Sequence, residues 1–510
     1  MRTLTAILIA LLSTLFTTPL PAQQAPSPFG EGWGEVKHEV RAVWLTTIGG
    51  LDWPHSYSQT ATSARKQQQE LISILDRLQH ANINTVLLQT RIRATTLFPS
   101  DADTGNEPWD GCLSGHPGQS PGYDALAFAI EECHRRGMEC HAWVVTIPVG
   151  KWNGTGCKHL RNTLPGVCYK IGDEGYMDPS NARTAQYLAH YCASLTRRYD
   201  LDGIHLDYIR YPESQKKLPQ ADEGRRLITR IVRAIHDSVK AVKPWVKMSC
   251  SPIGKHDDTH RYWSHGWNAR SRVLQDAKAW LREGLMDVEF PMMYFRGNNF
   301  YPFAVDWQEN IGGRQMVPGL GIYLMSGREK GWPLEDITRE MYVLRGLGMG
   351  FCMFRTKFLL DDTKGIYRFL CNTFAQYPAL QPVMKGYEQD VERPHCLTIV
   401  KHDSDVIVSW QAPSATTETG NHDAGGMLYN IYASPSYPVD ITDARNIIML
   451  KSRDTSLTLP AKGAEGLYFA VTAIDRYGNE SRVLQQSVPL NVGDAKPGWW
   501  YVTHPLRLRD

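Results

Sequence analysis

The chain has 510 residues and a formal net charge of +2, and 42% of its residues are hydrophobic. This length is enough for two or three domains with sizeable cores. The nearly neutral charge, without a long run of either sign, argues against nucleic acid or an anionic membrane surface as the partner.

Residues 1–22 have the pattern of a signal peptide. Met1-Arg2 supplies the positive start, residues 4–16 the apolar stretch, and Pro19-Leu-Pro-Ala22 a cleavage site with a small residue. The apolar stretch is too short to span a bilayer, and no other stretch predicts a transmembrane helix. We therefore expect an exported protein, in the periplasm or on the outer surface of a Gram-negative bacterium. Residues 23–37, rich in Pro, Gly and Gln, predict a mobile leader.

Residues 38–375 alternate between predicted strands and helices. The helix predicted over 64–81, for example, has Leu71, Ile74, Leu75 and Leu78 at helical spacing. Eight buried strands are predicted at residues 41–47, 84–91, 139–146, 203–207, 246–252, 286–294, 316–323 and 350–355. This alternation favours an α/β fold, a (β/α)8 TIM barrel. An open, doubly wound sheet is the alternative, but no glycine-rich phosphate loop follows the first strand.

The remaining residues have a different pattern. Residues 376–394 contain Pro378, Pro382 and Pro394 and predict a linker. Short alternating strands separated by Gly-, Asp- and Asn-rich turns then predict a small all-β sandwich over residues 395–492, followed by a tail at 493–510. Trp410 and the stretch 468–479 resemble a fibronectin type III module.

The 10 cysteines bear on disulfides and metals. Disulfides are permitted in an exported chain, and Cys157 and Cys168, which share one glycine-rich loop, are the expected pair. Cysteines in the helix and strand patterns are expected to be buried thiols. No CxxC or Cys/His spacing indicates structural zinc, and no cofactor is expected.

The end of the fourth predicted strand carries the main functional signal. The apolar run 203–206 leads directly into Asp207-Tyr208-Ile209-Arg210. A buried charge is costly unless it is paired or used, and active sites of parallel barrels lie at the carboxyl ends of the strands. We therefore predict that Asp207 is a catalytic carboxylate that acts on a sugar.

Other polar and aromatic side chains follow the remaining strands, and their convergence favours a single site. Each could separately be part of a structural ion pair or of the core. The predicted substrate-binding residues are Arg91, Arg93, His141, Trp143, Tyr208, Arg210, His256, Tyr294 and Tyr323.

Glycoside hydrolysis requires two carboxylates, one on each side of the scissile bond. Asp207 is the predicted nucleophile or base, with Arg210 or Arg91 holding its pKa low. Two residues remain as alternative candidates for the proton donor. Glu289 lies among apolar residues of the sixth strand, where desolvation would raise its pKa, and Glu107 lies on the long loop after the second strand.

Two other classes of function remain as hypotheses. One is a carbohydrate-binding barrel without catalysis, in which a second carboxylate is missing near Asp207. The other is a metal-dependent hydrolase that uses His256, His260 and His265. Because their spacing matches no standard zinc or calcium site, no metal is predicted.

Several ordered motifs resemble the bacterial glycosyl hydrolase-like family ten over about residues 40–374. They are Arg41-Ala-Val-Trp44, Gln89-Thr-Arg91, Glu107-Pro-Trp109, His141-Ala-Trp143, Asp202-Gly-Ile-His-Leu-Asp207, Ser251-Pro-Ile-Gly254 and Pro291 with Tyr294. The resemblance implies a (β/α)8 barrel and an exported glycosidase of the cell envelope that cleaves peptidoglycan glycan strands lacking stem peptides. No protein partner is implied.

Two departures from the family pattern concern the substrate more than the fold. Ala94-Thr95 stands where the family usually has an acidic residue, and Pro291-Met-Met-Tyr294 replaces a usual Pro-Gln before the tyrosine. A dietary or host glycan is therefore an alternative substrate.

Overall fold

The computed structural model describes residues 36–260, 262, 267–402, 404–413 and 426–490. The predicted signal peptide, the tail at 493–510 and almost all of the predicted leader lie outside these residues. Within them, no helix combines the length and apolar character needed to cross a membrane. The predicted domain boundaries stay predictions.

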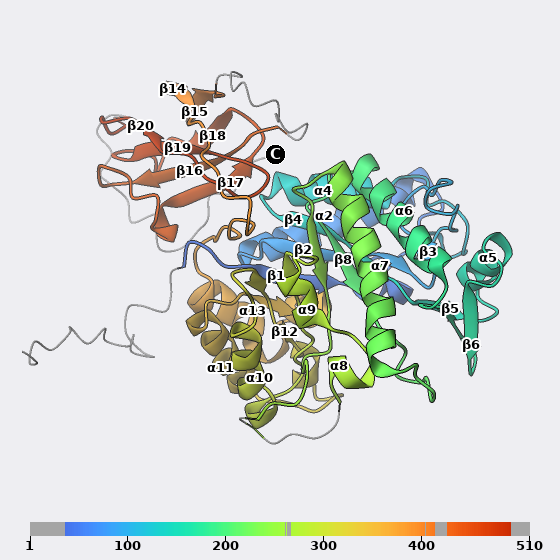
Figure 1. Cartoon of the computed structure of the whole chain (residues 1–510). Coiled ribbons are helices and arrows are strands. Elements are labelled where there is room, and N and C mark those ends of the chain that lie inside the picture. Colours follow the sequence, from blue (N-terminus) through green and yellow to red (C-terminus); the bar gives the residue numbers. More distant parts are fainter. Residues whose placement is uncertain (1–35, 261, 263–266, 403, 414–425, 491–510) are drawn as a thin grey trace, which may run out of the picture. The chain divides into compact units, whose positions relative to one another are not determined.

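Parallel strands form the centre of the fold (Figure 1). They are β1 (Arg41–Leu45), β2 (Thr85–Ile92), β4 (Glu139–Val145), β8 (Gly203–Asp207), β9 (Lys247–Cys250), β10 (Val288–Glu289), β11 (Gln315–Met316), β12 (Gly319–Leu320) and β13 (Phe351–Met353). β11 pairs with β10, and β12 pairs with β13. Only Val317 and Pro318 separate β11 from β12. Since Pro318 has no N–H to donate, it interrupts a single strand at this point. This strand closes the ring, and the predicted (β/α)8 barrel is confirmed.

Helices surround the strands, as Figure 1 shows for the first half of the barrel. The helices are α2 (Ala61–His80), α4 (Ala125–Arg135), α6 (Ala182–Arg198), α7 (Ala221–Val242), α8 (Ala269–Arg272), α9 (Ala277–Arg282), α10 (Tyr301–Gln308), α11 (Leu334–Gly346), α12 (Thr356–Leu360) and α13 (Ile366–Phe369). Leu71, Leu75 and Leu78 of α2 are buried in the large apolar layer between strands and helices. A smaller apolar cluster, which includes Trp44 and Phe290, fills the barrel interior.

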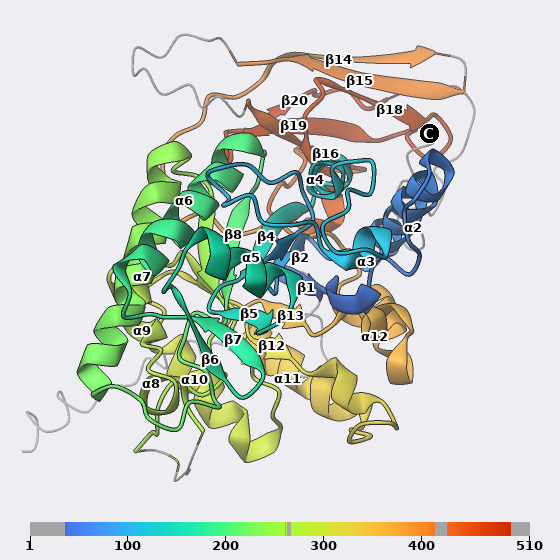
Figure 2. The same ribbon diagram turned by 90° about the vertical axis from the view of Figure 1, so that its right-hand side faces the viewer.

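Two insertions extend the loops at the carboxyl ends of the strands. After β2 come β3 (Thr95–Thr96) and α3 (Gly111–Ser114). After β4 come β5 (Pro148–Lys151), α5 (Thr155–Thr163), β6 (Cys168–Ile171) and β7 (Glu174–Met177), and β5, β7 and β6 form an antiparallel sheet (Figure 2). The predicted disulfide in this insertion is wrong, because Cys157 and Cys168 are both free. The Cys157 thiol instead packs against Gly175, where an added Cβ would lie 2.4 Å from its sulfur.

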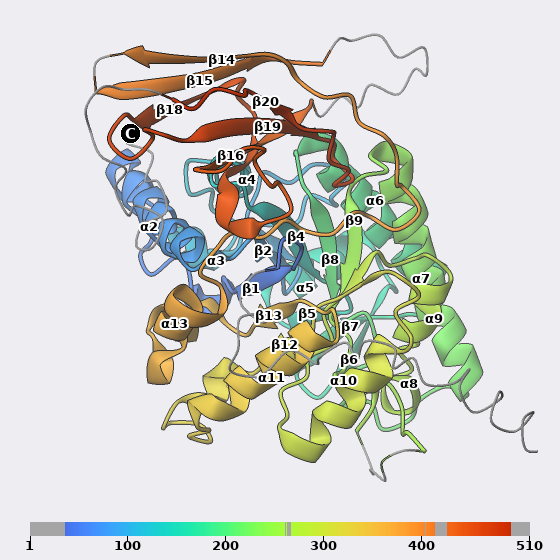
Figure 3. The ribbon, with the colours of Figure 1, turned by 90° about the vertical axis from the view of Figure 1, so that its left-hand side faces the viewer.

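The C-terminal strands form two antiparallel sheets, stacked as Figure 3 shows. One contains β14 (His395–His402), β15 (Asp405–Gln411) and β18 (Ser456–Pro460); the other contains β16 (Leu428–Ser434), β17 (Ile447–Ser452), β19 (Tyr468–Ile474) and β20 (Leu484–Gln485). Side chains from both sheets, such as Trp410 and Phe469, share one core. This arrangement agrees with the predicted small sandwich, while its likeness to fibronectin type III stays a prediction.

One buried carboxyl in the helix layer predicts a pH-dependent cost to stability. Glu340 of α11 is 1% exposed, and neither of its carboxyl oxygens has a hydrogen-bond partner within the described chain. Burial, followed by the charge of Asp336, raises the pKa of Glu340 to about 9. Between the ordinary glutamate pKa and this value, the folded state retains a proton that the unfolded chain releases, so stability falls as pH rises.

We therefore expect Glu340→Gln to raise the free energy of unfolding at neutral pH by up to about 3 kcal/mol. The gain should shrink as the pH falls toward about 5. Urea unfolding at several pH values measures it, with Glu335→Gln, an exposed position on the same helix, as the control. A gain that does not change with pH would contradict this explanation.

Candidate active site

The floor of the barrel mouth is a layer of aromatic side chains around one neutral histidine. The His205 ring lies 5.2 Å from the Phe290 ring, centroid to centroid. The indole Nε1 of Trp44 donates to His205 Nε2 over 3.3 Å, and His205 Nδ1 lies 3.0 Å from Ser249 Oγ. Because an indole N–H only donates, His205 carries its proton on Nδ1 and donates to Ser249. Burial, followed by the nearby His141, keeps the pKa of His205 well below its usual value.

Asp207 lies above this floor, at the carboxyl end of β8. Its side chain points into the barrel and is held by three donors from three directions. The Trp143 indole donates to Oδ2 over 3.1 Å, Ser251 Oγ donates to Oδ1 over 2.8 Å, and the Tyr208 backbone N–H donates to Oδ1 over 2.7 Å. Oδ2 therefore accepts one hydrogen bond and Oδ1 accepts two, which fixes the orientation of the carboxyl group.

The protonation of Asp207 differs from the sequence-based expectation. Burial raises the pKa of Asp207 above its ordinary value, although the charge of Arg210 and the hydrogen bonds from Ser251, Tyr208 and Trp143 oppose this. The prediction that an arginine holds this pKa low is therefore wrong in its net direction, since desolvation of the 6%-exposed residue outweighs Arg210. A carboxyl with a raised pKa suits proton donation better than nucleophilic attack.

The turn after β8 brings a second set of charges beside Asp207. Tyr208 has a positive φ of 52° and is 36% exposed. The Arg210 guanidinium lies over the Tyr208 ring, 4.0 Å from its centroid, and forms an ion pair of 2.7 Å with Glu213. The Glu213 side chain is 39% exposed, so this carboxylate remains open to solvent on the turn that follows Asp207.

Three aromatic rings form a wall on the opposite side of the mouth. Tyr294 follows β10, Tyr323 follows β12 and Phe354 follows β13. The Tyr294 and Tyr323 rings lie 5.8 Å apart, and Phe354 lies 5.3 Å from the first and 5.7 Å from the second. Burial, with smaller contributions from Cys352 and Asp207, raises the pKa of Tyr294, so its hydroxyl stays protonated. Such a wall can contact the apolar faces of sugar rings.

Glu107, one of the two predicted proton donors, lies away from the mouth. Its carboxylate pairs with the Arg91 guanidinium at 2.6 Å, accepts a hydrogen bond of 2.7 Å from the Tyr187 hydroxyl, and has no exposed side-chain surface. A bulge in β2 between Gln89 and Arg91 aligns Arg91 with Val144, on the outer face of the sheet. The roles predicted for Arg91 and Glu107 are therefore wrong: the pair is a buried structural contact with α6.

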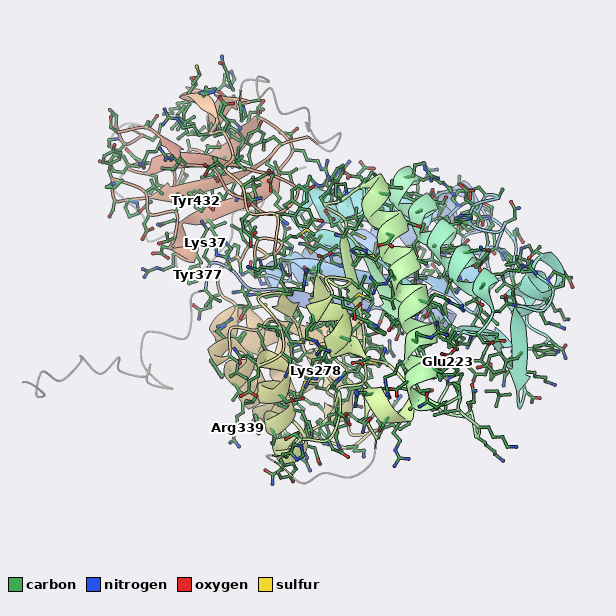
Figure 4. The ribbon with its side chains drawn as sticks, viewed as in Figure 1. Lys37, Glu223, Lys278, Arg339, Tyr377 and Tyr432 are labelled. Atoms are coloured by element: carbon green, nitrogen blue, oxygen red, sulfur yellow. The ribbon has the colours of Figure 1, made fainter. Side chains whose placement is uncertain are left out.

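Glu289, the other predicted donor, also faces the helices. Its neighbours in the chain, Val288 and Phe290, fill the barrel interior, so alternation turns Glu289 outward. Its Oε1 lies 3.9 Å from the Cys250 thiol, and the charges nearest to it are Asp276 and Lys278, the latter labelled on α9 in Figure 4. Burial does raise the pKa of Glu289, as predicted. The side chain, however, lies on the face of the strand that is turned away from the barrel mouth.

We expect Glu289→Gln to leave glycan cleavage within about twofold of the parent protein, since burial already favours the neutral carboxyl and the side chain lies behind the barrel wall. Amide and neutral carboxyl groups have nearly the same shape, so the fold should persist. Initial rates and circular dichroism measure the outcome. A loss of rate comparable to that of an Asp207 variant would return Glu289 to the reaction.

The remaining predicted binding residues divide into two groups. Trp143, Tyr208, Arg210, Tyr294 and Tyr323 surround Asp207, as described above. His141 lies deeper, 3.1 Å from Glu139 and against Gly203, and so does not reach the mouth. His256 is buried against Trp307 of α10, with the two rings 5.6 Å apart, and also does not contact the mouth residues. Arg93 is exposed on the loop after β2.

The loop considered for metal binding is described only in part. His265 lies outside the described residues, and His256 Nε2 lies 3.5 Å from an Asp276 carboxylate oxygen. Within the described residues, no group of three His, Cys, Asp or Glu side chains is arranged to hold a metal ion.

Three residues of the mouth were missing from the predicted site residues, namely Phe354, Ser251 and Glu213. Ser251 stands next to Asp207 because Leu206 pairs with Cys250, which places the following residues side by side. The motif around Ser251 was present in the sequence, and the alternation of β8 and β9 could have located it. Glu213 had no such signal, because it lies in an irregular turn whose path the sequence pattern does not fix.

Comparison with known proteins identifies related sequences. A family model described as "Glycosyl hydrolase-like 10" matches residues 39–319. "Glycosyl hydrolase YngK" of Bacillus subtilis is 26% identical over 485 residues, which cover 88% of this chain and 93% of that protein. "Glycosyl hydrolase DigH" of Escherichia coli K12 is 29% identical over 353 residues, which cover 60% of this chain and 79% of DigH.

Solved structures with a similar arrangement are more distant. An α-L-fucosidase from Paenibacillus thiaminolyticus matches with a TM-score of 0.43 and 15% identity, over 65% of this chain and 49% of the fucosidase, so the match spans about half of that enzyme. The catalytic domain of a β-amylase from Paenibacillus polymyxa matches with a TM-score of 0.42 and 8% identity, over 67% of this chain and 99% of that domain.

Proposed function

Because the chain belongs to the glycosyl hydrolase-like 10 family, we propose that it is an exported glycoside hydrolase with Asp207 as its proton donor. The observation that carries the proposal is the buried carboxyl of Asp207 at the carboxyl end of β8, with its raised pKa and its three donors. The names of YngK and DigH, both described as glycosyl hydrolases, support the same reaction class.

In this mechanism the proton sits on Oδ2 of Asp207, the oxygen that accepts only one hydrogen bond. It passes to the glycosidic oxygen as the bond to the leaving sugar breaks. The carboxylate that forms on Asp207 is then stabilised by Ser251, Trp143 and the Tyr208 N–H, which are already in place. Preorganised donors of this kind lower the barrier because they need not reorient during the reaction.

Glu213 is the proposed second carboxylate. It is open to solvent, carries its charge in the ion pair with Arg210, and stands on the turn that follows Asp207. A charged carboxylate can attack the sugar or activate a water, while a protonated one donates. Arg210 would thus orient Glu213 and also bias the protonation of Asp207, since its charge acts on that carboxyl.

The proposed substrate is the peptidoglycan glycan strand that lacks stem peptides. The family resemblance and the predicted signal peptide support this choice, because both indicate work in the cell envelope. A dietary or host glycan is the alternative, and a carbohydrate-binding barrel without catalysis is the second candidate function. The second candidate is favoured by one observation: within the described chain, no second carboxylate contacts Asp207 directly.

Chemical rescue of Glu213→Ala tests the catalytic proposal. We expect a loss of activity that azide or formate partly restores, because a small anion can occupy the space of a missing carboxylate. Glu223→Ala is the matched control, since Glu223 pairs with Arg226 three residues away in the same manner and lies on α7 (Figure 4). Full activity of Glu213→Ala without added anion would exclude Glu213, and inactivity of the parent protein on every glycan tested would favour the binding function.

A further inference from the structure

A hollow lies on the same face of the barrel as Asp207. It has a volume of about 820 Å³ and is lined by residues of the loops after β1, β2 and β4, including Tyr57, Arg93, Asp110, Lys151 and Glu174. We call it the flank groove. Since all three loops follow carboxyl ends of barrel strands, the flank groove opens on the catalytic face. Its volume is within the range of small-molecule sites, about 300–1,000 Å³.

The charges of the flank groove are paired only in part. Lys151 forms an ion pair of 2.6 Å with Glu174, and His55 pairs with Glu70. Asp110 accepts hydrogen bonds from Thr95 and from the Cys112 N–H. Among the residues that the structure describes, the Arg93 guanidinium has neither a hydrogen bond nor an ion pair. Within the described residues, Arg93 is therefore the cation of the flank groove that has no ion pair, while Asp110 keeps its negative charge because its donors are neutral.

An aromatic platform lies in the same groove. Tyr57 is 60% exposed, and its ring rests on Gly115, where an added Cβ would lie 3.1 Å from the ring. The Arg93 stem is held in a similar way against Gly150, at 2.8 Å from an added Cβ. Glycines thus let the loop backbones come close beneath both side chains and hold them in place.

The insertion after β4 connects this groove to the surroundings of Asp207. Lys151 of β5 and Glu174 of β7 line the groove. On the same strand β7, the Tyr176 hydroxyl lies 3.4 Å from Ser214 Oγ, next to Glu213. One strand therefore borders both the flank groove and the turn that carries Glu213.

We propose that the flank groove binds a carboxylated sugar of the same polymer that is cleaved at Asp207, with its ring on Tyr57 and its carboxylate on Arg93. This inference rests on the proposed function and names the substrate class as an acidic polysaccharide. An exposed ring face suits the apolar face of a sugar, and a guanidinium binds a carboxylate through charge-assisted, bidentate hydrogen bonds.

Binding to an uncleaved ligand tests the proposal. The protein carries Asp207→Asn, and the probe is a stem-peptide-free peptidoglycan oligosaccharide, whose lactyl groups end in free carboxylates. The same oligosaccharide after reduction of these carboxyl groups to alcohols is the matched ligand. Titration calorimetry compares Arg93→Gln and Tyr57→Ala with Arg65→Gln, an exposed position on α2.

We expect Arg93→Gln to raise the Kd for the carboxylated probe on the order of tenfold or more. It should not change the Kd for the reduced probe. Tyr57→Ala should weaken the binding of both probes, and Arg65→Gln should change the binding of neither probe. An unchanged Kd in Arg93→Gln, an equal loss with both probes, or no binding by the Asp207→Asn protein would overturn the proposal. Arg93-dependent binding by a protein that cleaves no glycan would instead contradict the proposed function and leave the groove intact.

Discussion

Asp207→Asn is expected to reduce the rate of glycan cleavage by about 10³-fold while the barrel stays folded. Asparagine keeps the shape of the side chain but has no proton to donate, so the leaving sugar must depart as an alkoxide. Initial rates on stem-peptide-free glycan measure the loss, and circular dichroism with thermal unfolding checks the fold. Asp173→Asn, at an exposed turn of the β6–β7 hairpin, is the control.

The pH profile of Ser251→Ala distinguishes proton donation from other roles of Asp207. A proton donor must be protonated, so activity is lost as pH rises through the pKa of Asp207. The Ser251 hydrogen bond lowers this pKa, and its removal should move the alkaline limb of the profile to higher pH. A limb that moves to lower pH, or an active Asp207→Asn protein, would remove Asp207 as the donor.

Glu107→Gln should lower the free energy of unfolding by about 3–5 kcal/mol. The substitution leaves the Arg91 guanidinium without its carboxylate partner in a fully buried site. Burial lowers the pKa of Arg91, but the charge and the hydrogen bond of Glu107, with smaller contributions from Tyr187 and Tyr191, raise it above its ordinary value. Denaturant unfolding measures the loss, and Glu131→Gln, from an exposed pair with Arg135, should have little effect.

A double variant separates a structural pair from a catalytic one. Replacing both Arg91 and Glu107 with apolar residues removes the unpaired charge and should recover part of the stability. Where the protein remains folded, its activity per folded molecule should match the parent. If the single and double variants are equally unstable, or if folded Glu107→Gln is inactive, the structural assignment of Glu107 is wrong.

The sequence pattern was sufficient for the barrel because each predicted strand is a short apolar run between turn signals. It also located Asp207, since β8 alternates visibly between His205, which faces the interior, and Leu206, which faces the helices. The sixth strand offers no such contrast. Apolar residues on both sides of Glu289 are typical of a strand buried on both faces, so the sequence does not tell which face Glu289 occupies.

The position of Arg91 depends on a feature that alternation cannot predict. The bulge after Gln89 reverses the facing of the residues that follow, which turns Arg91 toward α6 and brings Glu107 with it. The loops at the mouth limit the prediction in a similar way. The positions of Glu213 and Tyr57 depend on irregular backbone, which the sequence pattern does not determine. Strand ends could thus be predicted from the sequence, whereas the second carboxylate and the flank groove required coordinates.

The most direct measurement is mass spectrometry of the products formed in ¹⁸O-labelled water from stem-peptide-free peptidoglycan. A glycoside hydrolase acting through Asp207 should release short oligosaccharides with one ¹⁸O at each new reducing end, and the Asp207→Asn protein should release none. Oligosaccharides without the label would indicate cleavage by a route other than hydrolysis. The absence of products from this and from a panel of dietary and host glycans would contradict the assignment of the barrel as a glycosidase.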